Sequence, residues 1–230
     1  MDKSGNTEGA AKAQIPQRPP RTNRLADLRS HRNRFSAATN DPAFSEADDD
    51  DQWTQHPLEQ HVMVHEAGHA IFALDHDIPF QDVLLRNRHD EASPDSNPFE
   101  VRAELRFAGE DRSTWAGRDP EKGFRFAFAG MYAEMAVLGE PYPEGAALDL
   151  QSWCDGVNVR RGASDDEVDK VLGRSQATVL QEVDVWASRD TTVRRVERLA
   201  EHFTKKLESA DSAEDPVVTY AEVVSVLPRV

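Results

Sequence analysis

The stretch Pro57-Leu-Glu-Gln-His-Val-Met-Val-His-Glu-Ala-Gly-His-Ala-Ile-Phe-Ala-Leu74 decides the fold of this chain. Its apolar residues recur at helical spacing and form a wide buried face, and the proline suits the first turn of that helix. Within it, His65, Glu66 and His69 form the pattern His-Glu-x-x-His. Residues four apart on a helix lie on one face, so both imidazoles can reach one metal ion, and Glu66 can act as a base beside it.

An alternative interpretation of this stretch is a pair of buried, hydrogen-bonded histidines without a metal. Gly68 is a poor helix former in the middle of the predicted helix, which indicates a packing or site-access reason for it. The apolar, helix-periodic surroundings and this glycine favour the metal site.

Outward from this stretch, the sequence predicts a mainly α fold with a small two- to three-stranded sheet. The second strand alternates clearly, with Val101, Ala103, Leu105 and Phe107 on one face. Ser164 to Glu167 is a capping box, and Thr219 caps a last helix. The expected strands are 82–88 and 100–107, and the expected helices are 57–74, 120–138, 146–154, 164–187 (continuing past Gly173), 191–209 and one from 219.

Composition divides the chain into two parts. Residues 1–45 carry eight Lys/Arg against four acidic residues, whereas the whole chain of 230 residues has a net charge of −15. We expect residues 1–52 to be a disordered basic arm with an acidic linker end, and residues 53–230 to be the folded domain. The acidic balance of that domain argues against specific nucleic-acid binding.

No membrane span, signal peptide or cysteine framework is predicted. No apolar run approaches the roughly 20 residues that a membrane-spanning helix needs. The N-terminus lacks the apolar core of a secretory signal, so we expect a cytoplasmic protein. Cys154 is the single cysteine, which excludes an internal disulfide or a cysteine-rich zinc site, and we expect it to be buried.

A catalytic zinc usually has three protein ligands, so a third must come from outside the predicted helix 57–74. His61 shares a face with His65, but three ligands on one straight helix cannot surround a tetrahedral ion. Carboxylates are better candidates. Glu134 lies in the predicted helix 120–138, and Asp149 is expected to open a short helix after a Pro/Gly-rich turn. Spacing alone does not choose between these two.

Three motifs resemble the FtsH-type zinc peptidases. His65-Glu-Ala-Gly-His-Ala70 is similar to their site motif HEAGHA, and Ala129-Gly-Met-Tyr-Ala-Glu-Met-Ala-Val-Leu-Gly139 is similar to their helix reading aGraAEeliFG. Gly145-Ala-Ala-Leu-Asp-Leu-Gln151 resembles their GAsnDLqqAT, whose aspartate is the third zinc ligand. The resemblance covers roughly residues 57–228. It implies a zincin-like FtsH-type peptidase domain in which His65, His69 and Asp149 hold Zn²⁺, Glu66 is the catalytic base, and Glu134 is a supporting or packing residue.

The resemblance therefore implies a zinc metalloendopeptidase that acts on peptides or unfolded proteins. FtsH proteins also carry membrane helices and an ATPase module, but no GxxxxGK[ST] phosphate loop is present here, so we expect hydrolysis without ATP. A peptide substrate would lie extended along the strand 101–107 by strand addition. The alternative is a catalytically silent, peptidase-like zinc-binding module that recruits or senses a partner.

Overall fold

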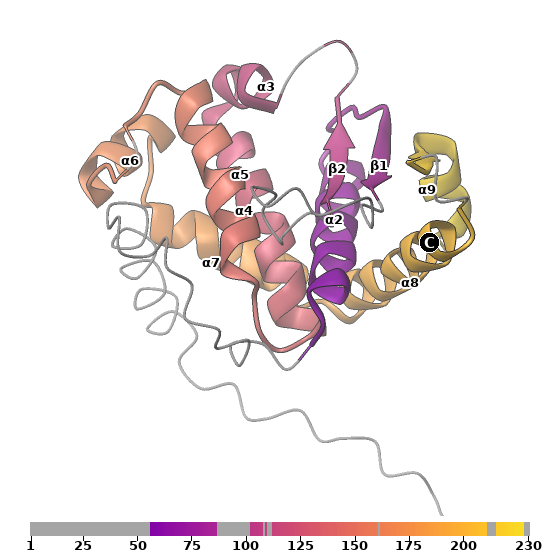
Figure 1. Ribbon diagram of the computed structural model, residues 1–230. Helices are drawn as coiled ribbons and strands as arrows, with labels where there is room; N and C mark the ends of the chain where they lie inside the picture. Colours follow the sequence, from indigo (N-terminus) through magenta and orange to yellow (C-terminus); the bar gives the residue numbers. More distant parts are fainter. Residues whose placement is uncertain are drawn as a thin grey trace, which may run out of the picture. The chain divides into compact units, whose positions relative to one another are not determined.

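The computed structural model describes residues 56–86, 102–107, 109, 112–160, 162–210 and 215–227. Within these residues the fold is mainly α, with eight helices and a three-stranded antiparallel sheet (Figure 1). The predicted arm, residues 1–52, lies outside the described residues, so its boundary with the domain stays a prediction. The helices are α2 (Leu58–Asp75), α3 (Arg112–Arg118), α4 (Pro120–Val137), α5 (Pro143–Gly156), α6 (Asp165–Leu172), α7 (Gln176–Ala187), α8 (Asp190–Glu208) and α9 (Tyr220–Val226).

The sheet has the strand order β2-β1-β3, with β1 in the middle. Its strands are β1 (Asp82–Arg86), β2 (Arg102–Arg106) and β3 (Val217–Thr219). Val83 is aligned with Leu105 on one side and with Val218 on the other, and all three side chains are buried. Val217 to Thr219 was not expected as a strand, although the expected strand count of two to three is confirmed.

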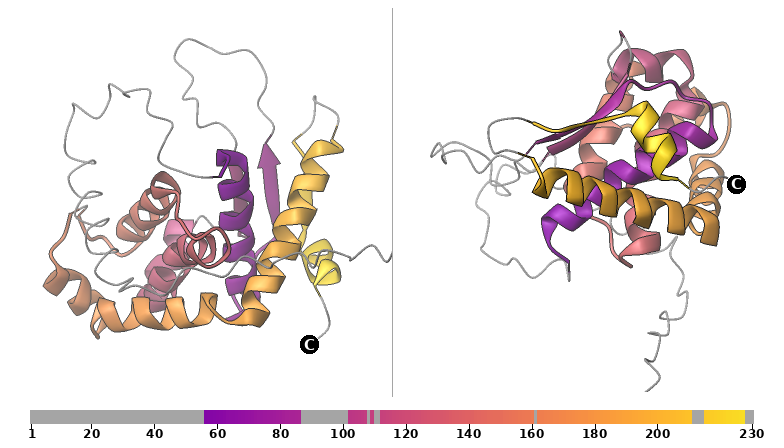
Figure 2. Two further views of the ribbon diagram at one scale, coloured as in Figure 1. Left: turned by 90° about the horizontal axis from the view of Figure 1, so that it is seen from below. Right: turned by 90° about the vertical axis from the view of Figure 1, so that its right-hand side faces the viewer.

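Helix α2 is the central element of the fold. It packs against α4 on one side and α8 on another, and it contacts β2 (Figures 1 and 2). Gly68 explains how α2 and α4 approach so closely, because a Cβ there would lie 2.5 Å from the Cβ of Ala133 and 3.1 Å from the carbonyl oxygen of Ala129. The packing reason that the sequence indicated for Gly68 is therefore the contact between α2 and α4.

A second group of buried side chains joins α3, α4 and α5 to α6 and α7. Trp153 is almost fully buried there against Phe124, and its indole N–H donates to the carbonyl oxygen of Pro120 over 2.8 Å. Cys154 is buried in the same cluster, as expected. This packing holds α5 against α3 and α4, and so fixes the position of the residues that α5 carries.

Local signals placed most helix ends correctly. Asp119 caps α4 through the N–H of Lys122, and both capping boxes are present, at Ser164 of α6 and at Thr219 of α9. The expected continuation of one helix past Gly173 is wrong, because Gly173 adopts a left-handed φ of 69° and ends α6.

Two helices differ further from expectation. The short helix α3 was not predicted at all. Helix α5 begins at Pro143 rather than near residue 146, because proline is favoured in the first turn of a helix. The strand ends expected at 87–88 and 100–101 lie outside the described residues.

Candidate metal centre

The two histidines of the His-Glu-x-x-His motif lie one turn apart on α2 and face the same space. Their Nε2 atoms are 3.0 Å apart, and both side chains are buried. Candidate ligand atoms of His65, Glu66 and His69 all lie within 4.8 Å of one another. The buried His-Glu-His group predicted from the helical spacing is therefore present, and its donor atoms can hold a metal ion.

Asp149 reaches the same point from α5. Its Oδ2 lies 2.7 Å from Nε2 of His65 and 2.8 Å from Nε2 of His69. The residue is in the second turn of α5, not at the start of a helix, because Pro143 to Gly145 already belong to the first turn. The structure thus brings together the three residues that the resemblance assigned to the metal.

Glu66 lies beside this point but is turned toward the sheet. Its Oε2 accepts a hydrogen bond from the backbone N–H of Leu105 in β2 over 3.1 Å. Among the strands that the structure describes, β2 lies at an edge of the sheet. Glu66 therefore stands between the three converging donors and an edge strand.

Glu134, on α4, binds the opposite side of the His65 ring. Its Oε1 lies 2.5 Å from Nδ1 of His65, whereas Oε2 lies 2.7 Å from Nδ1 of His61 and accepts from the backbone N–H of Tyr142 over 2.5 Å. A carboxylate has only acceptors, so Glu134 favours the tautomer of His65 that carries its proton on Nδ1, and in that tautomer the lone pair of Nε2 is free to bind a metal ion. Nε2 faces Asp149 and His69.

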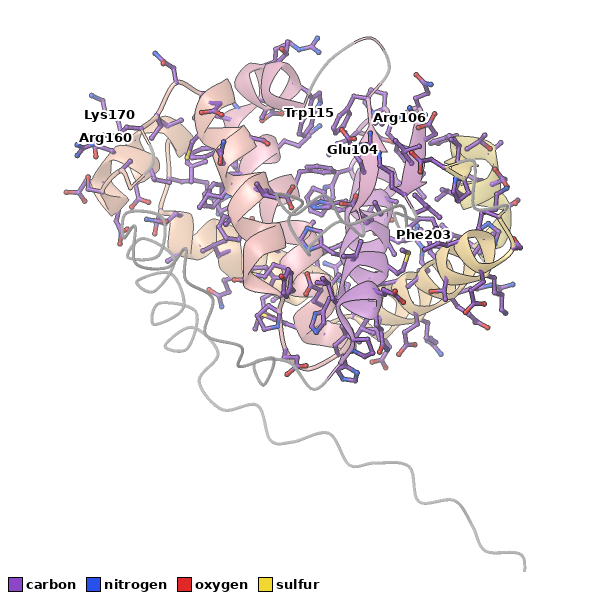
Figure 3. The ribbon with its side chains drawn as sticks, viewed as in Figure 1. Glu104, Arg106, Trp115, Arg160, Lys170 and Phe203 are labelled. Atoms are coloured by element: carbon purple, nitrogen blue, oxygen red, sulfur yellow. The ribbon has the colours of Figure 1, made fainter. Side chains whose placement is uncertain are left out.

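Glycine and aromatic residues fix the two rings. A Cβ at Gly130 would lie 2.6 Å from Nε2 of His65, and one at Gly145 would lie 3.2 Å from Cε1, so only glycine at 130 leaves room for this ring. The ring of His69 stacks on Phe126, with centroids 4.5 Å apart. Phe126 in turn contacts Trp115 of α3 (labelled in Figure 3). Trp115 stacks on Phe107 just after β2.

The converging donor atoms fit a zinc ion. Two imidazoles and one carboxylate with an open fourth position form a ligand set typical of catalytic zinc sites. Tetrahedral ligands at the usual bond lengths are about 3.3 Å apart, so the observed separations of 2.7–3.0 Å need to open by only a few tenths of an ångström. In addition, Glu134 holds one metal-facing imidazole in the tautomer that zinc binding requires.

His61 is the site residue that sequence reasoning undervalued. The sequence placed it on the face of His65 but offered it no role, and the structure brings it to Glu134. Its position one turn before His65 was the only available signal. Of the other histidines, His76 packs against the ring of Phe72 at the end of α2, where burial lowers its pKa although the nearby Asp75 opposes this shift. His31 and His89 lie outside the described residues.

The chain was compared with protein-family models, with curated proteins and with solved structures, and none of the three comparisons finds a match. None of the helices within the described residues is long and apolar enough to cross a membrane.

Proposed function

We propose that this protein is a zinc-dependent metallopeptidase of the FtsH type, with His65, His69 and Asp149 as zinc ligands and Glu66 as the general base. The observation that carries the proposal is the meeting of three donor atoms from α2 and α5, all within 3.0 Å of one another, beside the Glu66 carboxylate. Asp149 is 80 or more residues from the two histidines in the sequence. Their meeting therefore depends on the tertiary fold and not on a local sequence pattern.

The proposed chemistry assigns one task to each residue. A zinc ion bound at this site would polarise the scissile carbonyl and lower the pKa of a bound water. Glu66 accepts the proton of the attacking water and passes it to the leaving amine. The N–H of Leu105, which donates to Glu66, holds this carboxylate beside the metal-facing nitrogens.

The proposed substrate is an extended peptide or a segment of an unfolded protein. Strand β2 lies at the edge of the sheet, where a peptide can add as a further strand by backbone hydrogen bonds. Leu105 of this strand also contacts Glu66, so a peptide bound along β2 lies next to the proposed base.

The substitution Glu66→Gln tests the proposal. Glutamine keeps the shape of the side chain, and its amide oxygen still accepts the Leu105 N–H, but it does not take up a proton. We expect zinc to remain bound, while hydrolysis of an unfolded protein substrate falls by about 10²–10⁴-fold. Glu59→Gln is the matched control, because Glu59 is an exposed glutamate on the same helix.

The measurement pairs zinc content with the hydrolysis rate for the wild type and both variants. Equal hydrolysis by the wild type and Glu66→Gln, with zinc in both, would remove Glu66 from the mechanism. A wild type that binds zinc and hydrolyses nothing would instead identify the silent zinc-binding module. Absence of zinc from the wild type would contradict both functions.

A further inference from the structure

We infer that His61 is a positioning residue for the metal centre, acting on His65 through Glu134. The inference rests on the zinc site proposed above. The resemblance to FtsH-type peptidases is carried by residues 65–70, 129–139 and 145–151, so it assigns His61 nothing. The role follows from the contacts of a single carboxylate that joins two imidazoles of α2.

Glu134 is held at both oxygens. Oε1 accepts from His65, whereas Oε2 accepts from His61 and from the backbone N–H of Tyr142. The side chains of His61 and Glu134 are both 0% exposed. His61 and the N–H of Tyr142 together hold Oε2, and this restrains the carboxylate from rotating away from His65, so that Nε2 of His65 stays directed at the metal position.

The helix geometry explains why one carboxylate serves both rings. His61 and His65 are four residues apart, so their side chains lie one turn apart on the same face of α2. Each directs its Nδ1 at Glu134, at 2.7 Å and 2.5 Å. Since Nδ1 of His61 is engaged by Glu134, it is not available as a metal ligand, and its effect on the site passes through the carboxylate.

The other nitrogen of His61 makes no hydrogen bond within the described residues. Nε2 lies 3.6 Å from Oε1 of Glu140, which is an ion-pair distance but longer than a hydrogen bond. A fully buried imidazole is costly unless its polar atoms are paired. The bond to Glu134, at 2.7 Å, is the shorter of these two contacts of His61.

The test compares His61→Asn with His61→Gln in the full-length chain. The Asn amide nitrogen takes nearly the place of Nδ1 and can still donate to Glu134, whereas the Gln amide nitrogen takes nearly the place of Nε2 and cannot. We expect zinc affinity, measured by chelator competition, to stay within about threefold of the wild type for Asn and to fall on the order of tenfold for Gln. The visible spectrum of the Co²⁺-substituted protein, which depends on ligand orientation, should shift for Gln only.

Each outcome decides the inference. Equal affinity and spectra for the wild type and His61→Gln would overturn it, as would equal losses in both variants, because burial of a polar side chain alone does not distinguish Asn from Gln.

Circular dichroism of both variants shows whether they fold. If His61→Gln does not fold, Asn must still match the wild type in affinity and spectrum, and a weakened Asn variant would contradict the inference. Failure of the wild type to bind zinc would overturn the proposed function and this inference together, whereas zinc binding without hydrolysis leaves the inference intact.

Discussion

At the scale of single residues, two buried carboxylates contact the same imidazole, that of His65, at opposite nitrogens. Asp149 faces Nε2 of His65, and Glu134 faces Nδ1. A metal ion and the hydrogen-bonding partner of its ligand occupy opposite nitrogens of a zinc-bound histidine. The two carboxylates are therefore expected to contribute unequally to zinc binding.

We predict that Asp149→Asn weakens zinc binding more than Glu134→Gln. For Asp149→Asn, loss of an anionic ligand should lower the zinc affinity by more than about 100-fold. For Glu134→Gln we expect about a 10–100-fold loss, which is typical of residues that hold a ligand in place. Chelator competition measures both variants, with Asp155→Asn on the exposed side of α5 as the control. The reverse order of losses would make Glu134 the ligand and remove Asp149 from the metal.

At the scale of helices and strands, periodicity and capping residues predicted most of the helices and strands. They failed where the ends of an element depend on backbone conformation or tertiary contacts. The periodicity of residues 57–74 predicted α2, and Asp119 next to Pro120 predicted the start of α4. The periodic pattern on both sides of Gly173 suggested one helix, yet a left-handed glycine divides it into α6 and α7. Helix α3 has only seven residues, too few for a periodic pattern to distinguish it from a loop.

The same limit applies to the metal centre. The spacing of His65 and His69 is a property of one helix, so the sequence predicted their shared face directly. Asp149 lies 84 residues from His65, and Glu134 lies 73 residues from His61. Such distant contacts depend on how α4 packs on α2 and α5 packs on α4, and periodicity contains no information about that packing. Only the resemblance selected Asp149 over Glu134.

The capping box of α9 leads to a prediction about pH. Glu222 accepts from the backbone N–H of Thr219 and from Lys206 of α8, and these contacts, the one to Lys206 foremost, lower its pKa from 4.5 to about 2. A lowered pKa in the folded state means that the carboxylate stabilises the fold above pH 4.5, and that this contribution is lost as the pH falls toward 2.

We therefore expect Glu222→Gln to be less stable than the wild type at pH 7 and equal to it near pH 2. The difference at pH 7 should be about 1 kcal/mol, because solvent reaches the side chain and screens the ion pair. Urea unfolding at several pH values measures it. Glu201→Gln is the control, since Glu201 pairs with Lys205 on the exposed face of α8 without a backbone contact. A difference that does not change with pH would contradict the assignment to the carboxylate charge.

At the scale of the whole molecule, the chain closes its sheet with its last described elements. Strand β3 covers the side of β1 that β2 leaves open, and the N–H of Leu85 donates to the carbonyl oxygen of Pro216. Val218 of β3 and Val223 of α9 are fully buried. The fold of residues 56–86, which carry the two site histidines and β1, therefore depends on residues more than 130 positions later in the chain.

The two ends of the chain should consequently differ in their effect on stability, and paired deletions test this. Removing residues 211–230 takes away two fully buried valines, each worth about 1.5–3 kcal/mol, from a fold whose whole stability is on the order of 5–15 kcal/mol. We expect the melting temperature to fall by about 10–20 °C. Removing residues 1–45, which are poor in large apolar side chains, should change it by less than about 2 °C. Calorimetry of both truncated proteins measures the contrast, and a large drop on removing residues 1–45 would contradict the expectation that this segment adds nothing to the stability of the domain.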